Sequence, residues 1–409
     1  MVFKCQEDSF LKQYTSTVIS CTKSSLDTTK EGKKSSVNGY EIILKDTILF
    51  PEGGGQPCDY GFLNDKPVFQ VTRKEDKAII FVTEPFNVGD SVEQKVDWPR
   101  RFDHMQQHSG QHLITAIIDR EFKFPTVSWW LGEEVSHIEL DTPFITPEQI
   151  SSAEEIVNEL IRSGKKVSVE VIKESNSANE IKARTRGLPD DHKGDIRIIT
   201  IEDVESNMCC GTHVTNLSQL QVIKLLHSEK SKRKNKTLLY FLVGNRVLKK
   251  LSSCLEREAK LTTLLNNNPN QHYELVERLQ KNTKLINKNL QSVLKELAIA
   301  EAQKLKNSVP HPKFFIHYKK EADVDYINTF LREINDTETV TFLFLAVGDE
   351  KTTGNIVLYG QESDVQNLGN QISNILEGKG AGKGKKFQAK VTKMANMKKA
   401  EELIKNHFK

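Results

Sequence analysis

Two pairs of metal-binding residue types stand about a hundred residues apart in this sequence. His108 and His112 are spaced so that both imidazoles lie on one face of a helix. Cys209 and His213 have the same spacing and add a thiol and a third imidazole, as expected at a strand-to-turn corner. Either pair alone is weak evidence for a metal site, because histidines at this spacing are more often hydrogen-bonded or solvent-facing. Together the four residues predict one zinc ion per chain.

Two neighbours compete for the role of metal ligand. His104 would extend the helical series by one more step, but that span is longer than one tetrahedral ion comfortably bridges, so we expect it beside the site or on the surface. Cys210 follows Cys209 directly, and neighbours in an extended segment point to opposite faces, so only one should face the metal. A thiol hydrolase using Cys210 is an alternative, although a cysteine beside a zinc ligand is more simply structural.

A second conspicuous segment reads Phe-Pro-Glu-Gly-Gly-Gly-Gln at residues 50–56. Its glycines, Gly53, Gly54 and Gly55, allow the backbone to approach another chain or a ligand closely. A flexible turn is the simpler interpretation. A phosphate-binding P-loop is excluded, because no Lys-Ser or Lys-Thr pair follows.

These motifs require elements to position them. Short β-prone runs separated by turn residues predict a small β-barrel or sandwich, at residues 16–21, 40–44, 68–71, 78–82 and 91–96. Helical periodicity then places the histidines on a helix at 105–122. A strand at 129–140, a helix at 147–163 and strands at 166–171, 195–201 and 214–223 complete an α+β layer.

The second half of the chain begins with a helical stretch at 249–306, broken at 266–269 and therefore read as a hairpin or projecting arm. Strands at 314–317, 341–347 and 355–359 and a helix at 364–376 follow, and then a glycine-rich loop. A coiled-coil seam is formed by Leu279, Ile286, Leu290, Val293 and Leu297. We therefore predict a multidomain α+β protein with a β-barrel-like domain at 1–100, a metal-binding core at 101–248, a helical linker at 249–309 and an α/β domain at 310–409.

Composition excludes several classes of protein. Lys and Arg number 58 and Asp and Glu number 55, so the net charge of +3 does not by itself predict a polyanionic partner. The chain has no apolar run approaching the roughly 18–20 residues that span a bilayer, and no membrane partner is expected. Its six cysteines, scattered except for one adjacent pair, suit reduced thiols in the cytoplasm.

The motifs stand in the order found in the editing domain of alanyl-tRNA synthetase. Residues 1–250 resemble that domain and its freestanding relatives, the AlaX family of alanyl-tRNA editing proteins. The Gly-Lys repeat at 378–386 resembles the long form of AlaX. This resemblance implies zinc ligands at His108, His112, Cys209 and His213 and a substrate loop at Gly53, Gly54, Gly55 and Gln56.

The implied activity is hydrolysis of the ester that joins serine, or glycine, to the 3′ end of alanine tRNA. We expect a zinc-dependent trans-editing enzyme without charging activity, because the class II synthetase core that precedes this domain in the synthetase is not evident. The oligomeric state is left open. Phosphate contacts are expected in two basic segments, for which a solvated hairpin and a basic tail are the simpler alternatives. They contain Lys230, Lys232, Arg233, Lys234 and Lys236, and Lys379, Lys383, Lys385 and Lys386.

The sequence departs from the synthetase pattern at several positions. Ser109, Gly110 and Gln111 replace Thr-Ala-Thr, Cys210 stands where glycine is usual, and Trp129 replaces a glutamine. We expect the departures to line the amino-acid pocket, with Gln111 in its wall. Thr126 and Ser128 are candidates for a hydrogen bond to the serine hydroxyl, and their simpler roles are those of turn and strand residues.

Two further classes of protein are alternatives to an editing enzyme. A zinc peptidase is disfavoured, because no glutamate lies between His108 and His112 to act as a general base. Four protein ligands are typical of a structural zinc. The main rival is therefore a non-catalytic tRNA-binding or adaptor protein with a structural zinc.

Overall fold

The computed structural model describes residues 2–30, 33–172, 196–334, 342–349 and 353–409, and its contacts divide the chain into two units, Met1–Lys260 and Leu261–Lys409. Both units mix helices and strands, which confirms the predicted α+β class. No helix in the described ranges is long and apolar enough to cross a membrane. The four-part division predicted from the sequence stays a prediction.

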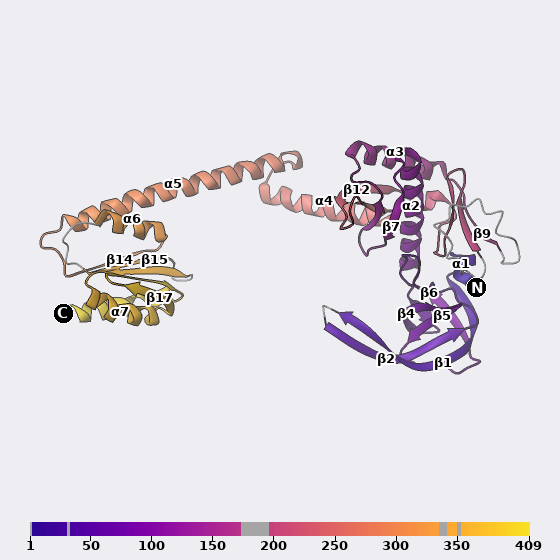
Figure 1. Ribbon diagram of the computed structural model, residues 1–409, viewed down its shortest axis with the longest axis horizontal. Coiled ribbons are helices and arrows are strands. Elements are labelled where there is room, and N and C mark those ends of the chain that lie inside the picture. Colours follow the sequence, from indigo (N-terminus) through magenta and orange to yellow (C-terminus); the bar gives the residue numbers. More distant parts are fainter. Residues whose placement is uncertain (1, 31–32, 173–195, 335–341, 350–352) are drawn as a thin grey trace. The chain divides into compact units, whose positions relative to one another are not determined.

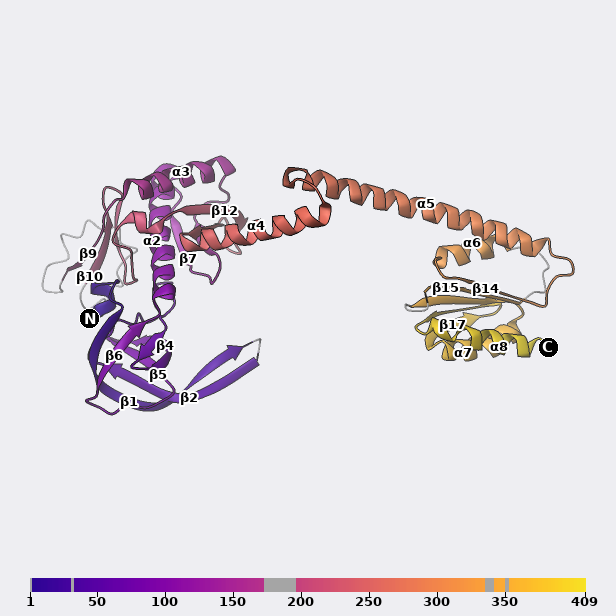
Figure 2. The same cartoon turned by 180° about the vertical axis from the view of Figure 1, so that it is seen from behind.

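A closed barrel of six strands opens the first unit, in the order β1-β2-β5-β4-β3-β6. Strands β1, β2 and β4 are longer than the predicted runs, β6 coincides with the run at 91–96, and β3 was not predicted. Strands β1 and β2 continue past the barrel as a hairpin (Figure 2). The glycine motif lies between β2 and β3. A short helix, α1 (Lys4–Glu7), precedes β1 (Gln13–Lys30), β2 (Lys33–Leu44), β3 (Gly61–Leu63), β4 (Lys66–Lys74), β5 (Lys77–Val82) and β6 (Ser91–Val96).

The histidine-bearing helix, α2 (Trp98–Phe122), runs from the barrel toward α3 (Pro147–Ser163) (Figure 1). Its N-terminus is capped by the carboxylate of Asp97, which accepts a hydrogen bond from the Arg100 amide. The predicted start at residue 105 was therefore wrong by two turns. In these additional turns Arg101 is fully buried and pairs with Asp59, which precedes β3 of the barrel.

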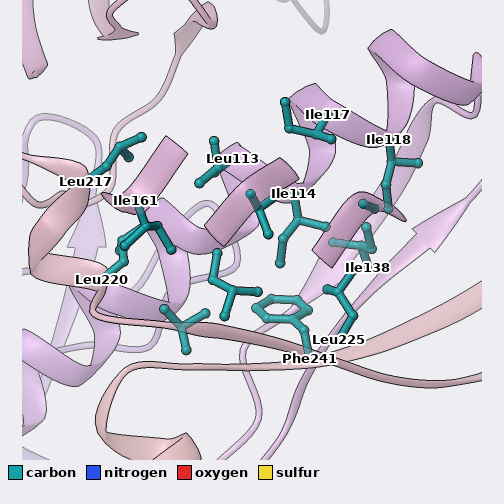
Figure 3. Packing of buried hydrophobic residues seen from close by; sticks show 14 of the residues in the cluster. Leu113, Ile114, Ile117, Ile118, Ile138, Ile161, Leu217, Leu220, Leu225 and Phe241 are labelled. Atoms are coloured by element: carbon teal, nitrogen blue, oxygen red, sulfur yellow. The ribbon is translucent and has the colours of Figure 1, made fainter. Parts of the chain in front are cut away.

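The apolar half of α2 forms the core of the first unit with a four-stranded sheet, in the order β12-β13-β8-β7. Figure 3 shows Ile114 of α2 beside Phe241 of the sheet. The sequence prediction of one strand at 129–140 was wrong, because a turn separates two antiparallel strands there. The sheet consists of β7 (Thr126–Trp130), β8 (Ser136–Leu140), β12 (Ile223–Lys230) and β13 (Thr237–Val243).

A smaller sheet, in the order β11-β10-β9, leads into the second half of the metal motif. It consists of β9 (Val167–Ile172), β10 (Ile196–Ile201) and β11 (Glu205–Met208), and Cys209 follows directly. The strand predicted at 214–223 is wrong. Its central residues form a short 3-10 helix, η2 (Leu217–Leu220), because the Asn216 side chain accepts from the Ser218 amide and starts the turn.

Two helices follow, separated at the break that the sequence predicts. They are α4 (Asn245–Leu265), which crosses the boundary between the units, and α5 (His272–Lys306), with a turn of 3-10 helix, η3 (Pro269–Gln271), between them.

The second unit is a three-layer α/β/α arrangement (Figure 1). Its sheet, in the order β14-β15-β16-β18-β17, packs α5 and α6 on one face and α7 and α8 on the other. Strand β15 is apolar throughout because both faces are covered. The remaining elements are β14 (Phe314–Lys319), α6 (Val324–Ile334), β15 (Phe342–Val347), β16 (Gly354–Tyr359), α7 (Glu362–Ile375), β17 (Gly378–Lys383), β18 (Lys386–Val391), η4 (Met394–Asn396) and α8 (Met397–His407).

The glycine-rich stretch at the end of α7 is not the predicted loop. It forms β17, the edge strand of the sheet, and pairs with β18 from Gly378 opposite Val391 to Lys383 opposite Lys386. Glycine disfavours strands locally, but a paired neighbouring strand overrides that preference.

Candidate metal centre

Four side chains from the two sequence motifs meet in the first unit. One donor atom each from His108, His112, Cys209 and His213 lies within 4.8 Å of the other three. The cysteine sulfur is 3.3 Å from Nε2 of His108 and 3.3 Å from Nε2 of His213. In a tetrahedral site with ordinary bond lengths, a nitrogen and a sulfur ligand are about 3.6 Å apart. The residues therefore fit a single metal ion, and neither Cys210 nor His104 belongs to the cluster.

The protonation state of the cluster suits metal binding. Burial, together with the neighbouring imidazoles, lowers the pKa of His108 and of His213 well below the usual value of 6.5. Both rings are therefore neutral at pH 7, the form in which histidine binds metals.

The orientation of His108 is set by the last residue of the glycine motif. Gln56 Oε1 accepts a hydrogen bond from the Thr212 amide at 3.0 Å and lies 2.8 Å from His108 Nδ1. Because this oxygen can only accept, Nδ1 carries the proton and Nε2 is left to face Cys209. Gly211 makes the contact possible, since a Cβ there would lie 2.1 Å from the His108 ring. Gln56 thus orients a side chain that could hold a metal ion.

The orientation of His213 depends on Ser109, a residue that the sequence did not single out for this role. Ser109 Oγ accepts from the Val214 amide at 3.1 Å and lies 2.9 Å from His213 Nδ1. Nε2 of His213 then faces the Cys209 sulfur. The sequence offered one sign of this role, because Ser109 directly follows the candidate ligand His108 and precedes the candidate ligand His112.

The backbone that carries Cys209 is held by a buried arginine. Arg197 Nη1 donates to the Cys209 carbonyl at 2.6 Å, and Nε donates to the Gln6 carbonyl at 2.8 Å. Gln6 in turn donates to the carbonyl of Cys210 at 2.7 Å. Sequence reasoning missed this residue, although an arginine within the apolar run of β10 was the signal for it.

The glycine motif and Trp129 cover one side of the cluster. The Trp129 ring lies 4.7 Å from the His108 ring, centroid to centroid, and its Nε1 donates to the Gly54 carbonyl at 3.2 Å. Gly55 has a φ of +85°, and a Cβ there would lie 2.7 Å from the indole. The backbone at Gly55 therefore lies against Trp129 of the same chain, and its contact with a substrate stays a prediction. Cys210 lines the same wall, since its sulfur would lie 3.2 Å from a Cβ on Gly54.

The predicted amino-acid pocket residues fall into two polar networks. Gln111 Nε2 donates to Thr115 Oγ1 at 2.9 Å, and that hydroxyl is 3.1 Å from the hydroxyl of Thr126. The hydroxyl of Ser128 donates instead to Glu139 at 2.6 Å. A register shift in β7 between Thr126 and Ser128 separates the two side chains. The remaining motif residue, Gly53, has no close neighbour for a Cβ, since the nearest atom is 3.9 Å away.

The residues predicted to contact phosphates lie on two hairpins. Between β12 and β13, Arg233 pairs with Glu139 at 3.0 Å and Lys236 pairs with Asp141. No ion pair within the described ranges involves Lys230, Lys232 or Lys234. In the second unit, the hairpin of β17 and β18 carries Lys379, Lys383, Lys385 and Lys386.

Fold and site together define a relative of the tRNA synthetases. Residues 196–240, which include Cys209 and His213, match the family model described as the threonyl and alanyl tRNA synthetase second additional domain. The chain is 48% identical to the Alanyl-tRNA editing protein Aarsd1 of Mus musculus, over 100% of this chain and 98% of that protein.

More distant relatives carry related names. The Putative alanyl-tRNA editing protein alaX of Saccharomyces cerevisiae is 32% identical over 96% of this chain and 93% of its own length. The Alanyl-tRNA editing protein AlaX-L of Pyrococcus horikoshii is 30% identical over 63% of each chain. The chain belongs to the family of alanyl-tRNA editing proteins.

Proposed function

We propose that this protein is a zinc-dependent aminoacyl-tRNA deacylase that removes serine, and also glycine, from mischarged alanine tRNA in the cytoplasm. Support comes from the relatives named alanyl-tRNA editing proteins and from a cluster of four metal-binding side chains whose histidines are already oriented. The single observation that carries the proposal is the link between the glycine motif and the metal cluster, through Gln56 and His108.

The cluster is preorganised by this chain's own residues. Gln56 keeps the proton of His108 on Nδ1, and Ser109 bonds Nδ1 of His213, so the Nε2 atoms of both rings face the cysteine sulfur. Three imidazoles and one thiolate are a donor set that zinc accepts. When bound there, zinc would supply positive charge to hold the substrate's amine or to polarise its ester.

The surroundings of the cluster favour a reaction sheltered from bulk water. The Gly54–Gly55 backbone and the indole of Trp129 cover His108 and are proposed to contact the aminoacyl ester. Beside them, Gln111, Thr115 and Thr126 form a buried polar chain. Such a chain can bond the serine hydroxyl, and alanine would leave its groups unpaired, which is a basis for selecting serine.

The rest of the chain is proposed to bind tRNA. The lysines of the β12–β13 hairpin and of the β17–β18 hairpin are placed to contact phosphates. In the proposed organisation, residues 1–100 supply the glycine motif, 101–248 the metal core, 249–309 a helical linker and 310–409 a tRNA-binding domain.

Purified protein should be incubated with alanine tRNA carrying serine, glycine or alanine, and its zinc content measured. We expect about one zinc per chain, and release of serine at least about 100-fold faster than release of alanine, because an unpaired buried polar group is costly. Equal rates would indicate a generic esterase. Tight tRNA binding with zinc present but no release of any amino acid would favour the adaptor with a structural zinc.

A further inference from the structure

The four-stranded sheet of the first unit, β12-β13-β8-β7, packs one of its faces against α2. Side chains alternate between the two faces along each strand. The face toward α2 is apolar and includes Ile138 and Phe241 (Figure 3). The opposite face, the outer face, carries one ring from each of the four strands. These rings belong to Trp130, His137, Tyr240 and His227.

The rings of the outer face form a continuous row, because the register of the sheet places them side by side. Trp130 pairs with His137 across β7 and β8, and His137 pairs with Tyr240 across β8 and β13. The ring centroids are 5.5 Å apart in the first pair and 5.3 Å apart in the second. The His227 ring lies 4.9 Å from the Tyr240 ring. Because neighbouring strands are about 4.8 Å apart, the row follows the strands across the whole sheet.

Both ends of the row are open to solvent. Trp130 is 56% exposed, and 63% of the His227 side chain is exposed, while the two rings between them are partly buried. The Trp130 indole is nevertheless held in place over the turn after β7, since a Cβ on Gly132 would lie 2.4 Å from it. A ring that is exposed and already ordered loses little conformational entropy when a ligand binds.

The two strands that carry Tyr240 and His227 continue into the basic β12–β13 hairpin. Two of its cations, Arg233 and Lys236, pair with carboxylates. Within the described ranges, no ion pair involves the other three, Lys230, Lys232 and Lys234. Lys230 follows His227 by three residues on β12. A row of rings therefore leads into a group of cations, which matches a ligand that has flat rings and negative charge.

Unpaired RNA has this chemistry. Its bases stack on tryptophan, tyrosine and histidine rings, and an open four-stranded sheet with such rings can stack two or three bases. Its phosphates are contacted by lysines. Glu229 beside the row accepts from the Tyr240 hydroxyl at 3.2 Å and lies 3.3 Å from Nε2 of His227. A carboxylate has about four acceptor sites, so Glu229 can also accept from a ribose 2′-hydroxyl, which DNA lacks.

We propose that the outer face of this sheet binds single-stranded RNA, with two or three unpaired bases stacked on the row of rings and with phosphates contacted by the β12–β13 hairpin. The surface is separate from the metal cluster, whose helix, α2, packs on the other face of the sheet. It requires no aminoacyl ester, so the assignment stands or falls independently of the proposed deacylase function.

The test measures binding of a labelled single-stranded RNA of about eight nucleotides, a length within the usual range of single-strand sites. Fluorescence anisotropy with the full chain compares it with an RNA duplex and with a DNA strand of the same sequence. The single-stranded RNA should bind at least about tenfold more tightly than the duplex, because paired bases cannot stack on the rings. The DNA strand should bind about threefold more weakly than the RNA, since it lacks the 2′-hydroxyl.

Two variants remove a ring from the row. Tyr240→Ala and Trp130→Ala should each weaken binding of the single-stranded RNA about tenfold, the usual effect of losing one stacked base. Trp130 is 56% exposed, so its removal leaves no cavity in the core and tests the row even if Tyr240→Ala folds poorly. Lys232→Ala should make the dependence of log affinity on log salt shallower by about 0.7, the value for one phosphate contact of a single strand.

Two controls separate stacking from a general effect on the protein. Tyr240→Phe keeps the ring and loses only the hydroxyl, so it should bind the single-stranded RNA within about threefold of the unaltered protein. Phe62→Ala removes a ring that is 46% exposed on strand β3 of the barrel, outside the row, and its affinity should stay within about twofold.

Four results would overturn the assignment. They are equal binding of single-stranded and duplex RNA, full affinity in both Tyr240→Ala and Trp130→Ala, a tenfold loss in Phe62→Ala as well, and failure of the unaltered protein to bind the single-stranded RNA. Equal binding of the DNA strand would overturn the assignment to RNA.

Discussion

At the scale of single residues, the chemistry depends on side chains that hold the ligands rather than on the ligands alone. Gln56 fixes the proton of His108 on Nδ1 by accepting at 2.8 Å. Gln56→Leu removes this bond while keeping most of the volume, so zinc affinity should fall about 10- to 100-fold. Competition with a chromogenic chelator measures the change. Gln111→Leu, on the same helix as the ligands but bonded to Thr115, should keep its zinc affinity.

The two adjacent cysteines, Cys209 and Cys210, differ in their distance from the histidines of the cluster. Only the sulfur of Cys209 lies 3.3 Å from two imidazole nitrogens, whereas Cys210 lies beside the glycine motif. Cys209→Ala should therefore lose most of its zinc, and Cys210→Ala should keep about one ion per chain. Metal analysis of both purified proteins decides the matter. Full zinc in Cys209→Ala would show that the wrong cysteine had been assigned.

At the scale of elements, the glycine motif is a fixed wall whose shape depends on Trp129. Gly55 has a positive φ, and a Cβ would press into the indole, so Gly55→Ala should displace the ring from His108. Small displacements of groups that position substrate cost about 100-fold in rate. We expect a loss of that order in serine release, measured in single turnover, with zinc content unchanged.

Gly53→Ala is the matched control, because a Cβ there has no neighbour closer than 3.9 Å. Its rate should stay within about threefold of the unaltered protein, the typical effect of a substitution without a steric conflict. If Gly53→Ala and Gly55→Ala lose activity equally, general flexibility of the loop, and not contact with Trp129, would explain its glycines.

At the scale of the whole molecule, we expect hydrolysis and tRNA binding to depend on different parts of the chain. A protein ending at Leu265, the last residue of α4, keeps the cluster and omits the β17–β18 hairpin. It should retain zinc and hydrolyse at saturating tRNA, but bind more weakly. The dependence of log affinity on log salt should become shallower by roughly one unit per lost phosphate contact. Filter binding over a range of salt concentrations measures both.

An unchanged affinity and an unchanged salt slope would contradict this division. The second unit would then be better explained as a surface for a protein partner. The exposed apolar residues of α5, such as Ile286 and Val293, would be the first place to look for it.

The sequence by itself determined which four side chains could hold a metal ion and where the strong helices lie. Spacing of four residues is a local property of the chain, so His108 and His112 had to share a helix face. The helix at 147–163 matched α3 because Thr146, Pro147 and Gly164 mark its ends within a few residues.

Only the tertiary structure decided which side chains orient the histidines of the cluster by hydrogen bonds. Gln56 meets His108 across 52 positions of the chain, and Ser109 meets His213 across 104. No local pattern encodes such contacts. The same reason explains the glycine-rich strand β17, since its conformation is imposed by pairing with β18 and not by its own residues. Local spacing therefore predicted the four side chains, and long-range packing decided their orientation.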